Sequence, residues 1–373
     1  MSETATTSIH GTPLRETHLA LGAEMCQVFG WEMPSSYTSP AEEHEAVRTA
    51  VGFIDLSYFG SLRIWGTEGA QFLHGLVTND VKGLKKGQGM RAAFLTGHGK
   101  VRALCRVLGL GDGEYLVIND PQTHEQIKQY VAPFSYAGDF KVEDVSDQRR
   151  VLSVQGPSSL LVMREVSFEP VPKLAPHEWM STIIAGHHVV VVGTRLTGEL
   201  GFDILVPAEG LKDVWDFVLV KGGFHSIRPF GHRALDSLKI EAGVPVYGID
   251  VDDTNMMLET DLADAVSFTK GCYTGQEAVA MATYRGHISK RLSGLRIQGE
   301  VIPARGDKVF KDGKEIGYIT SALKSPTLRS VIAMAYIKYG FYEPENPVDV
   351  LSEGISLRAV VAKLPFYRGA HSD

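Results

Sequence analysis

The sequence is poor in cysteine, and the cysteines that it has form no recognisable pattern. Cys26, Cys105 and Cys272 are odd in number, far apart and without a C-x-x-C spacing. This arrangement indicates neither a disulfide framework nor a thiolate metal cage, and it is typical of proteins in a reducing cytoplasm. His187 and His188 are adjacent, so their side chains diverge on a strand, and we expect no metal site.

The chain also lacks long apolar runs and an excess of positive charge. No stretch approaches the apolar length needed to cross a bilayer, and the Ser/Thr-rich residues 1–12 lack the apolar centre of a signal peptide. The formal net charge of −7 provides no general attraction to nucleic acid or to an anionic membrane. We therefore expect a soluble, cytoplasmic protein that has no membrane among its partners and no strong signal for binding nucleic acid.

The length and the pattern of the chain predict more than one domain. A chain of 373 residues exceeds one ordinary compact core, and its 44% hydrophobic and 22% charged residues are typical of a globular protein. Beyond about Lys290, short β-type segments alternate with turns such as Lys311-Asp312-Gly313-Lys314, as in a small all-β domain. The expected fold class is α+β with a β-rich C-terminal module.

Capping signals predict two helices near the start of the chain. Thr12-Pro13 places a capping residue before proline and Gly30 could close the pattern, so we expect a helix between them. Ser39-Pro40 repeats this arrangement, and Glu42 completes a capping box that should start a second helix.

The segment Lys270–Glu277 is the stretch that packing explains least. Cys272 lies between two glycines and just ahead of Thr274 and Glu277, whose T-x-x-E spacing predicts a capped helix start. A thiol at a helix N-terminus, beside the Lys270 ammonium, should ionise more easily than a free cysteine, and the thiolate is the reactive form. The alternative is that Cys272 is a small apolar filler and the glycines only shape a turn.

Two further side chains lie in glycine-containing turns. Glu199 follows Thr197-Gly198 between strands, and a carboxylate in a cleft could accept paired N–H groups from an amidine-like ring such as a pterin. Tyr247 follows a helix pattern over residues 232–242 and the turn at Gly243. The ordinary explanations are a solvated surface glutamate and a core tyrosine.

Several short stretches, taken together and in this order, resemble the glycine-cleavage T-protein family of folate-dependent aminomethyltransferases. The likeness runs from about Thr12 to Arg368, and although each stretch is weak alone, the ordered set is specific. The stretches are Gly30–Pro34, Glu43–Arg48, Phe53–Ser57, Asn79–Val81, Val154–Pro157, Thr197–Glu199, Asp236–Gly243 and Ser325–Leu328.

The resemblance implies a three-domain cloverleaf with a C-terminal β-barrel or jelly-roll module and a folate in the central opening. We expect a discontinuous folate-binding α+β domain of residues 1–56 and 148–285, an inserted α+β domain of residues 57–147, and a C-terminal barrel of residues 286–373. The implied cofactor is tetrahydrofolate or a one-carbon-substituted folate.

The resemblance also assigns four cofactor-binding positions. Glu199 matches the pterin-facing glutamate of the family, and Tyr247 matches its folate-contacting tyrosine. Asn119 falls in the strand beside the cofactor, and Arg368 matches the C-terminal arginine near the folate. The amidine–carboxylate argument for Glu199 agrees with the implied role.

One departure bears on the chemistry. T-proteins carry an Asp-Asp pair after a glycine-rich turn, and one of these aspartates is central to aminomethyl transfer. Here Ala103 and Leu104 occupy the corresponding positions, so the usual charge partner of the folate amine is missing. Asp55 and Asp236 are candidate replacements.

The Lys270–Glu277 segment instead resembles a sister branch of folate-binding proteins that maintain iron–sulfur enzymes, including some that modify tRNA. The resulting hypothesis is a tetrahydrofolate-binding protein with Cys272 and Lys270 as functional groups, and with iron–sulfur enzymes or assembly factors as partners. The alternatives are a tetrahydrofolate-dependent aminomethyl- or methyltransferase and a scaffold that has lost its ligand.

Overall fold

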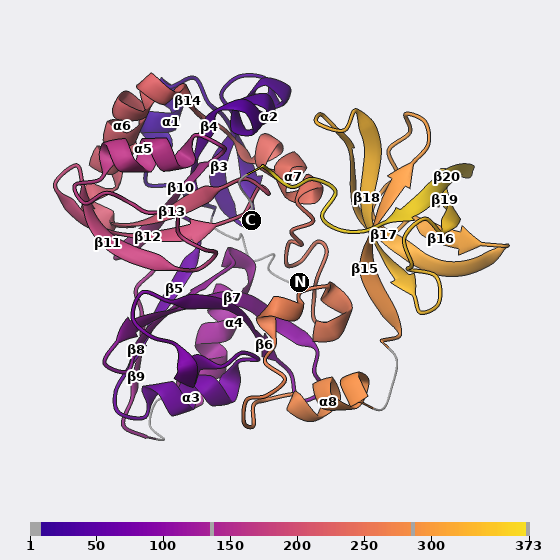
Figure 1. The fold of residues 1–373 in the computed structure, drawn as a ribbon, viewed down its shortest axis with the longest axis horizontal. Coiled ribbons are helices and arrows are strands. Elements are labelled where there is room, and N and C mark those ends of the chain that lie inside the picture. Colours follow the sequence, from indigo (N-terminus) through magenta and orange to yellow (C-terminus); the bar gives the residue numbers. More distant parts are fainter. Residues whose placement is uncertain (1–8, 135–137, 285–287, 371–373) are drawn as a thin grey trace, which may run out of the picture.

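The computed structural model describes residues 9–134, 138–284 and 288–370, and these form three lobes around a central region (Figure 1). Two lobes mix helices with a sheet, and the third is a β-barrel, so the predicted α+β class with a C-terminal barrel is confirmed. Among the described helices, none combines the length and apolar character that a membrane span requires. The predicted domain boundaries stay predictions, and the one at 285–286 lies outside the described residues.

The first lobe is built on a six-stranded sheet of order β11-β12-β13-β10-β4-β14. Alternate residues of its strands face opposite sides, as Phe53 and Ile54 do, and pack into two separate cores. Trp215 stacks on Phe53 in one core at a centroid distance of 4.4 Å. The strands are β4 (Val51–Asp55), β10 (Arg149–Gln155), β11 (Trp179–Ile184), β12 (His187–Thr194), β13 (Gly201–Pro207) and β14 (Ile227–Pro229).

Helices cover both faces of this sheet, and a small sheet of order β1-β3-β2 lies beside it. The helices are α1 (Arg15–Ala20), α2 (Pro40–Thr49), α5 (Ser159–Val166), α6 (Leu211–Gly222) and α7 (His232–Glu241). The small sheet consists of β1 (His10–Gly11), β2 (Glu24–Val28) and β3 (Trp31–Ser36).

The second lobe has a five-stranded sheet of order β6-β7-β8-β5-β9 with α3 and α4 on one face. Leu108 and Ile118, on the other face, pack into a core shared with the first lobe. This shared core holds the two sheets against each other. The elements are β5 (Gly60–Trp65), α3 (Gly69–Leu76), β6 (Gly89–Leu95), β7 (Val101–Gly111), β8 (Glu114–Asn119), α4 (Pro121–Val131) and β9 (Lys141–Asp144).

The third lobe is a closed barrel of order β15-β18-β17-β16-β19-β20. Between α7 and the barrel, residues 242–284 cross the second lobe and are called the crossing segment. They form α8 (Gln276–Tyr284) there (Figure 1). Tyr247 and Met257 of this crossing segment pack with Leu95 and Val101. The barrel strands are β15 (Lys290–Ile297), β16 (Lys308–Lys311), β17 (Lys314–Ser325), β18 (Ser330–Lys338), β19 (Pro347–Ser352) and β20 (Ile355–Ala362).

The two predicted N-terminal helices have different outcomes. The capping box is confirmed, because Ser39 Oγ accepts from Glu42 N at 3.3 Å and Glu42 accepts from Ser39 N at 3.2 Å. The helix between Thr12 and Gly30 is wrong, since α1 stops at Ala20 and β2 follows. The chain turns at Gly22, whose φ of 81° favours glycine.

Candidate functional site

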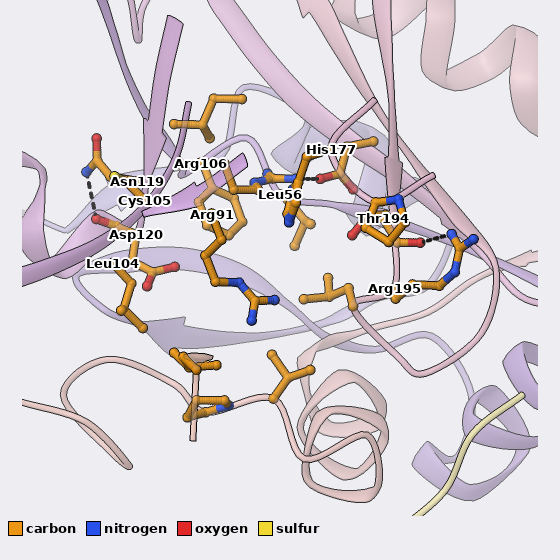
Figure 2. Close-up of a pocket in the computed structure, with 18 of the residues that line it drawn as sticks. Leu56, Arg91, Leu104, Cys105, Arg106, Asn119, Asp120, His177, Thr194 and Arg195 are labelled. Atoms are coloured by element: carbon orange, nitrogen blue, oxygen red, sulfur yellow. Dashed lines mark hydrogen bonds and ion pairs between the residues drawn. The ribbon is translucent and has the colours of Figure 1, made fainter. Parts of the chain in front are cut away.

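A cavity of ≈ 260 Å³ lies where the first and second lobes meet the crossing segment (Figure 2). Residues far apart in the sequence share its wall, because it is built from strands β7 and β8, the β12–β13 connection and helix α7. Its charged and polar lining residues are Arg91, Arg106, Asn119, Asp120, His177, Thr194, Arg195, Asp203, Lys239 and Asp264.

Two of the cations in the cavity are already paired with carboxylates. Arg106 forms an ion pair with Asp203, which also accepts from Ser153 Oγ at 2.5 Å. Arg91 Nη1 lies 3.4 Å from Asp264 Oδ1. Among the lining residues, Arg195 and Lys239 form no ion pair with a carboxylate of the described chain, so these two cations are available to an anionic ligand.

Arg195 has hydrogen-bonding capacity that the protein does not use. Its Nη1 donates to the Thr194 carbonyl at 2.7 Å, while its buried Nε has no partner within the described chain. Burial lowers the pKa of Arg195 from its ordinary value. A buried donor without an acceptor is costly, so this guanidinium is suited to a ligand acceptor.

His177 is a second lining residue with an unused polar atom. Its φ of 70° is in the left-handed region, and its buried Nδ1 has no hydrogen-bond partner among the described residues. Burial, together with the charges of Arg91 and Arg106, lowers its pKa to about 3. The imidazole is therefore neutral at pH 7, and its Nδ1 can donate or accept one hydrogen bond with a ligand.

Of the four predicted folate-binding residues, Asn119 alone lines this cavity. Its Nδ2 donates to the Asp120 carbonyl at 3.0 Å, and its Oδ1 lies 3.2 Å from His124 Nδ1. The amide of Asn119 thus uses both its nitrogen and its oxygen in hydrogen bonds that stabilise the end of β8. Tyr247 is buried nearby, where its hydroxyl donates to the Val101 carbonyl at 3.4 Å.

Glu199 is buried beneath the C-terminal segment, residues 363–370, and does not line the cavity. Its Oε1 accepts from Tyr367 Oη at 2.6 Å and lies 3.4 Å from Arg48 Nη1. A Cβ built on Gly369 would lie 2.1 Å from Glu199 Oε2, so the chain passes directly over the carboxylate. The adjacent Arg368 is exposed. A pterin could reach Glu199 only if this segment moved.

Lys270 has a role that the sequence did not predict. Its buried ammonium donates to the carbonyls of His74, Val77 and Asn79 at 2.6, 2.6 and 2.9 Å. Burial lowers its pKa to about 8. Because lysine has three N–H donors, these carbonyls leave none for Cys272 and tie the crossing segment to the end of α3.

Cys272 is exposed and lies outside the cavity. The predicted helix start is displaced, since α8 begins at Gln276 and Thr274 Oγ1 lies 3.3 Å from Tyr130 Oη. The thiol is therefore accessible to a partner, but the geometry separates it from the cluster of charges around Asn119.

Neither proposed replacement for the missing acidic pair reaches the cavity. Asp55 is fully buried among Thr12, His18 and Ser57, and Asp236 lines a different hollow between α7 and the barrel. Ala103 packs into the core beneath α3 and α4, whereas Leu104 lines the cavity. Asp120, His177 and Arg195 belong to no motif in the sequence, and their common location in the cavity depends on contacts between lobes.

The sequence matches domain families and proteins whose likeness covers both mixed lobes and the barrel. Residues 14–270 match the GCVT N-terminal domain, and residues 290–368 match the glycine cleavage T-protein C-terminal barrel domain. A protein of Halothermothrix orenii named aminomethyltransferase is 32% identical, over 95% of this chain and 99% of its own. One of the same name from Thermotoga maritima is also 32% identical, over 96% and 98%.

A solved structure gives the same result for the architecture. The glycine cleavage system aminomethyltransferase T from Bartonella henselae superposes with a TM-score of 0.89, over 97% of this chain and 99% of its own, at 23% identity. At this identity the superposition establishes the fold alone. The sequence matches, which cover both mixed lobes and the barrel, establish the relationship: the chain belongs to the glycine cleavage T-protein family.

Proposed function

We propose that this protein binds a reduced folate in the central cavity and transfers a one-carbon unit, as an aminomethyl- or methyltransferase. The observation that carries the proposal is the cavity itself, where a carboxylate, two available cations and unused polar atoms converge between the lobes. The relatives named aminomethyltransferase support the same reaction class. The cytoplasm is the proposed location.

The lining of the cavity fits the chemistry of a folate. Arg195 and Lys239 would bind the carboxylates of its glutamate tail, and the unpaired Nδ1 of His177 would exchange a hydrogen bond with its polar groups. The bound folate would supply a nucleophilic nitrogen. Tetrahydrofolate or a one-carbon-substituted form remains the proposed cofactor, and Glu199, Tyr247 and Arg368 remain proposed contacts.

Calorimetric titration with tetrahydrofolate tests this proposal. We expect saturable binding that weakens when a cavity cation is removed. A protein that folds normally and gives no heat of binding would instead be a scaffold that has kept the fold without the ligand.

A second function, support of iron–sulfur enzymes or of a tRNA-modifying enzyme, is favoured by the exposed thiol of Cys272. In this proposal the folate is a bound cofactor, and Cys272 contacts an iron–sulfur enzyme or assembly factor. An exposed side chain contributes little to packing, so Cys272→Ser should leave the free energy of unfolding within about 0.5 kcal/mol.

The cellular test of this second function compares two cysteines. In cells that lack the native gene, Cys272→Ser should fail to restore iron–sulfur enzyme activities that the wild type restores. Cys26→Ser is the matched control, because Cys26 is only partly exposed and lies in β2 of the first lobe. Full restoration by Cys272→Ser would remove the thiol from the proposal.

A further inference from the structure

The missing acid of strand β7 has a cross-strand neighbour that is acidic. Strands β7 and β8 are antiparallel, with Arg106 opposite Ile118 and Cys105 opposite Asn119. The ladder ends at this pair, and Leu104 and Asp120 are the residues directly beyond it on the two chain segments. Directly opposed positions hold their Cβ atoms about 4.5–5.5 Å apart, and both residues adjoin such a pair and line the cavity. We therefore expect a carboxylate at 120 to reach the region that one at 104 would occupy.

Asp120 and Leu104 share the face of the ladder that borders the cavity. Leu104, Arg106, Ile118 and Asp120 line it at alternate positions of the two chain segments. Cys105 and Asn119, which lie between them, also contribute to its wall. Asp120 has φ −61° and ψ 144°, so the extended chain continues through it before α4 begins. Figure 2 shows Asp120 and Leu104 at the same end of the cavity.

The carboxylate of Asp120 is not used to cap α4, although Asp120 is the residue that precedes the helix. An aspartate there ordinarily accepts from an N–H of the first turn. Instead the Asp120 carbonyl accepts from Thr123 N and Thr123 Oγ1, each at 3.1 Å, and from Asn119 Nδ2 at 3.0 Å. Nothing in the described chain donates a hydrogen bond to the Asp120 carboxylate, so it is available to a ligand.

The other carboxylates in the cavity are engaged. Asp203 is held by Arg106 and Ser153, and Asp264 by Arg91. Burial raises the pKa of Asp120 above its ordinary value, while the charges of Lys239, Arg106 and Arg91 oppose this shift. A carboxylate with a raised pKa accepts a proton more readily than a free aspartate does.

We propose that Asp120 is the catalytic base of one-carbon transfer in this protein, in place of the absent acid at position 104. This inference rests on the proposed function. As the folate nitrogen forms its bond to the one-carbon group, the bond between that carbon and the donor breaks, and its electron pair leaves with the donor. The proton of the nitrogen passes to the Asp120 carboxylate, which becomes the neutral acid.

The test follows transfer to tetrahydrofolate from three donors: the aminomethyl donor of glycine cleavage, a betaine and a sulfonium compound. With the donor that the wild type uses, Asp120→Asn should lower kcat by about 10²–10⁴-fold, the contribution of a positioned base, while the Kd for tetrahydrofolate stays unchanged. Leu104→Asp in the Asp120→Asn background should recover a measurable part of kcat, since it restores a carboxylate across the strand pair.

The matched control is Asp112→Asn, which makes the same exchange at an exposed turn between β7 and β8. It should retain the kcat of the wild type. A wild-type kcat in Asp120→Asn would overturn this inference and leave the proposed function intact. A parallel loss of kcat, binding and thermal stability, with no recovery by Leu104→Asp, would also overturn it and make Asp120 structural. If the wild type transferred a one-carbon group from none of the three donors, both the proposed reaction and the role of Asp120 as its base would be contradicted.

Discussion

Arg48→Met is expected to lower the free energy of unfolding by about 3–5 kcal/mol, because it leaves buried carboxylates without their cation. Arg48 Nη2 lies 2.7 Å from Glu241 Oε2, and Nη1 lies 3.4 Å from Glu199 Oε1. Nη1 also donates to the Thr197 carbonyl at 2.7 Å, and the guanidinium stacks 4.0 Å from the ring centroid of Tyr367. One side chain thus joins α2, α7 and the C-terminal segment.

Urea unfolding measures this effect, and Arg63→Met is the matched control. Arg63 pairs with Glu114 at 2.7 Å and stacks on Trp65, but its side chain is 41% exposed. Solvent screens such a pair, so we expect a loss of about 1 kcal/mol or less. Equal losses in the two variants would contradict the structural role assigned to Arg48.

The network around Arg48 extends into the barrel through Glu241. Glu241 accepts from Ser325 Oγ and, at 2.8 Å, from Thr327 Oγ1 in the turn between β17 and β18. Burial acts to raise the pKa of Glu241, but hydrogen bonds from His44 and Ser325 and the nearby cations outweigh it and lower the pKa to about 2. Its contribution to stability is therefore complete above the unfolded pKa and is lost as the pH falls toward 2.

Asp55→Ala is expected to lower the free energy of unfolding by a similar amount, about 3–5 kcal/mol at pH 7. The side chain is fully buried, and its carboxylate accepts from Thr12 Oγ1 at 2.5 Å, His18 Nε2 at 2.9 Å and Ser57 N at 2.8 Å. Alanine would leave three buried groups without this acceptor. These hydrogen bonds hold the Asp55 carboxylate away from the residues that line the cavity.

The effect of Asp55→Ala should depend on pH. Burial acts to raise the pKa of Asp55, but hydrogen bonds from His18, Thr12 and Ser57 outweigh it and hold the pKa below the ordinary value. Since the folded pKa is depressed, the contribution is complete above the unfolded value of about 3.9 and shrinks below it.

Unfolding curves between pH 3 and pH 7 check this dependence. Asp147→Ala, which removes a carboxylate that is 96% exposed, should cost about 1 kcal/mol or less. A difference between the wild type and Asp55→Ala that does not narrow at low pH would contradict the assignment of a buried, ionised carboxylate.

Features that depend on neighbouring residues were predictable from the sequence. The capping box of Ser39 and Glu42 starts α2 because its hydrogen bonds join residues three apart. The helix expected between Thr12 and Gly30 failed because Gly22 turns the chain and β2 then pairs with β3. Side chains at helical spacing cannot reveal this sheet pairing, which overrides them.

The site was predictable only in part, for a similar reason. Asn119 was placed beside the cofactor by resemblance, and its neighbour Asp120 became evident only from the lining of the cavity at the end of β8. Lys270 was expected to favour ionisation of Cys272 because the two are close in sequence. Its ammonium instead donates hydrogen bonds to carbonyls in residues 74–79. The alignment of Arg195 and His177 around one cavity depends on how two lobes pack, which no local pattern encodes.

Binding of tetrahydrofolate to the central cavity is the claim on which the account depends, and isothermal titration of the wild type and Lys239→Met tests it most directly. We expect wild-type binding, and a Kd raised about 10- to 150-fold in Lys239→Met by the loss of one charge-assisted contact, typically about 1.5–3 kcal/mol. Lys221→Met, the same exchange at an exposed position of α6, should bind like the wild type. Absence of wild-type binding, or equal binding by all three proteins, would contradict a folate site in this cavity.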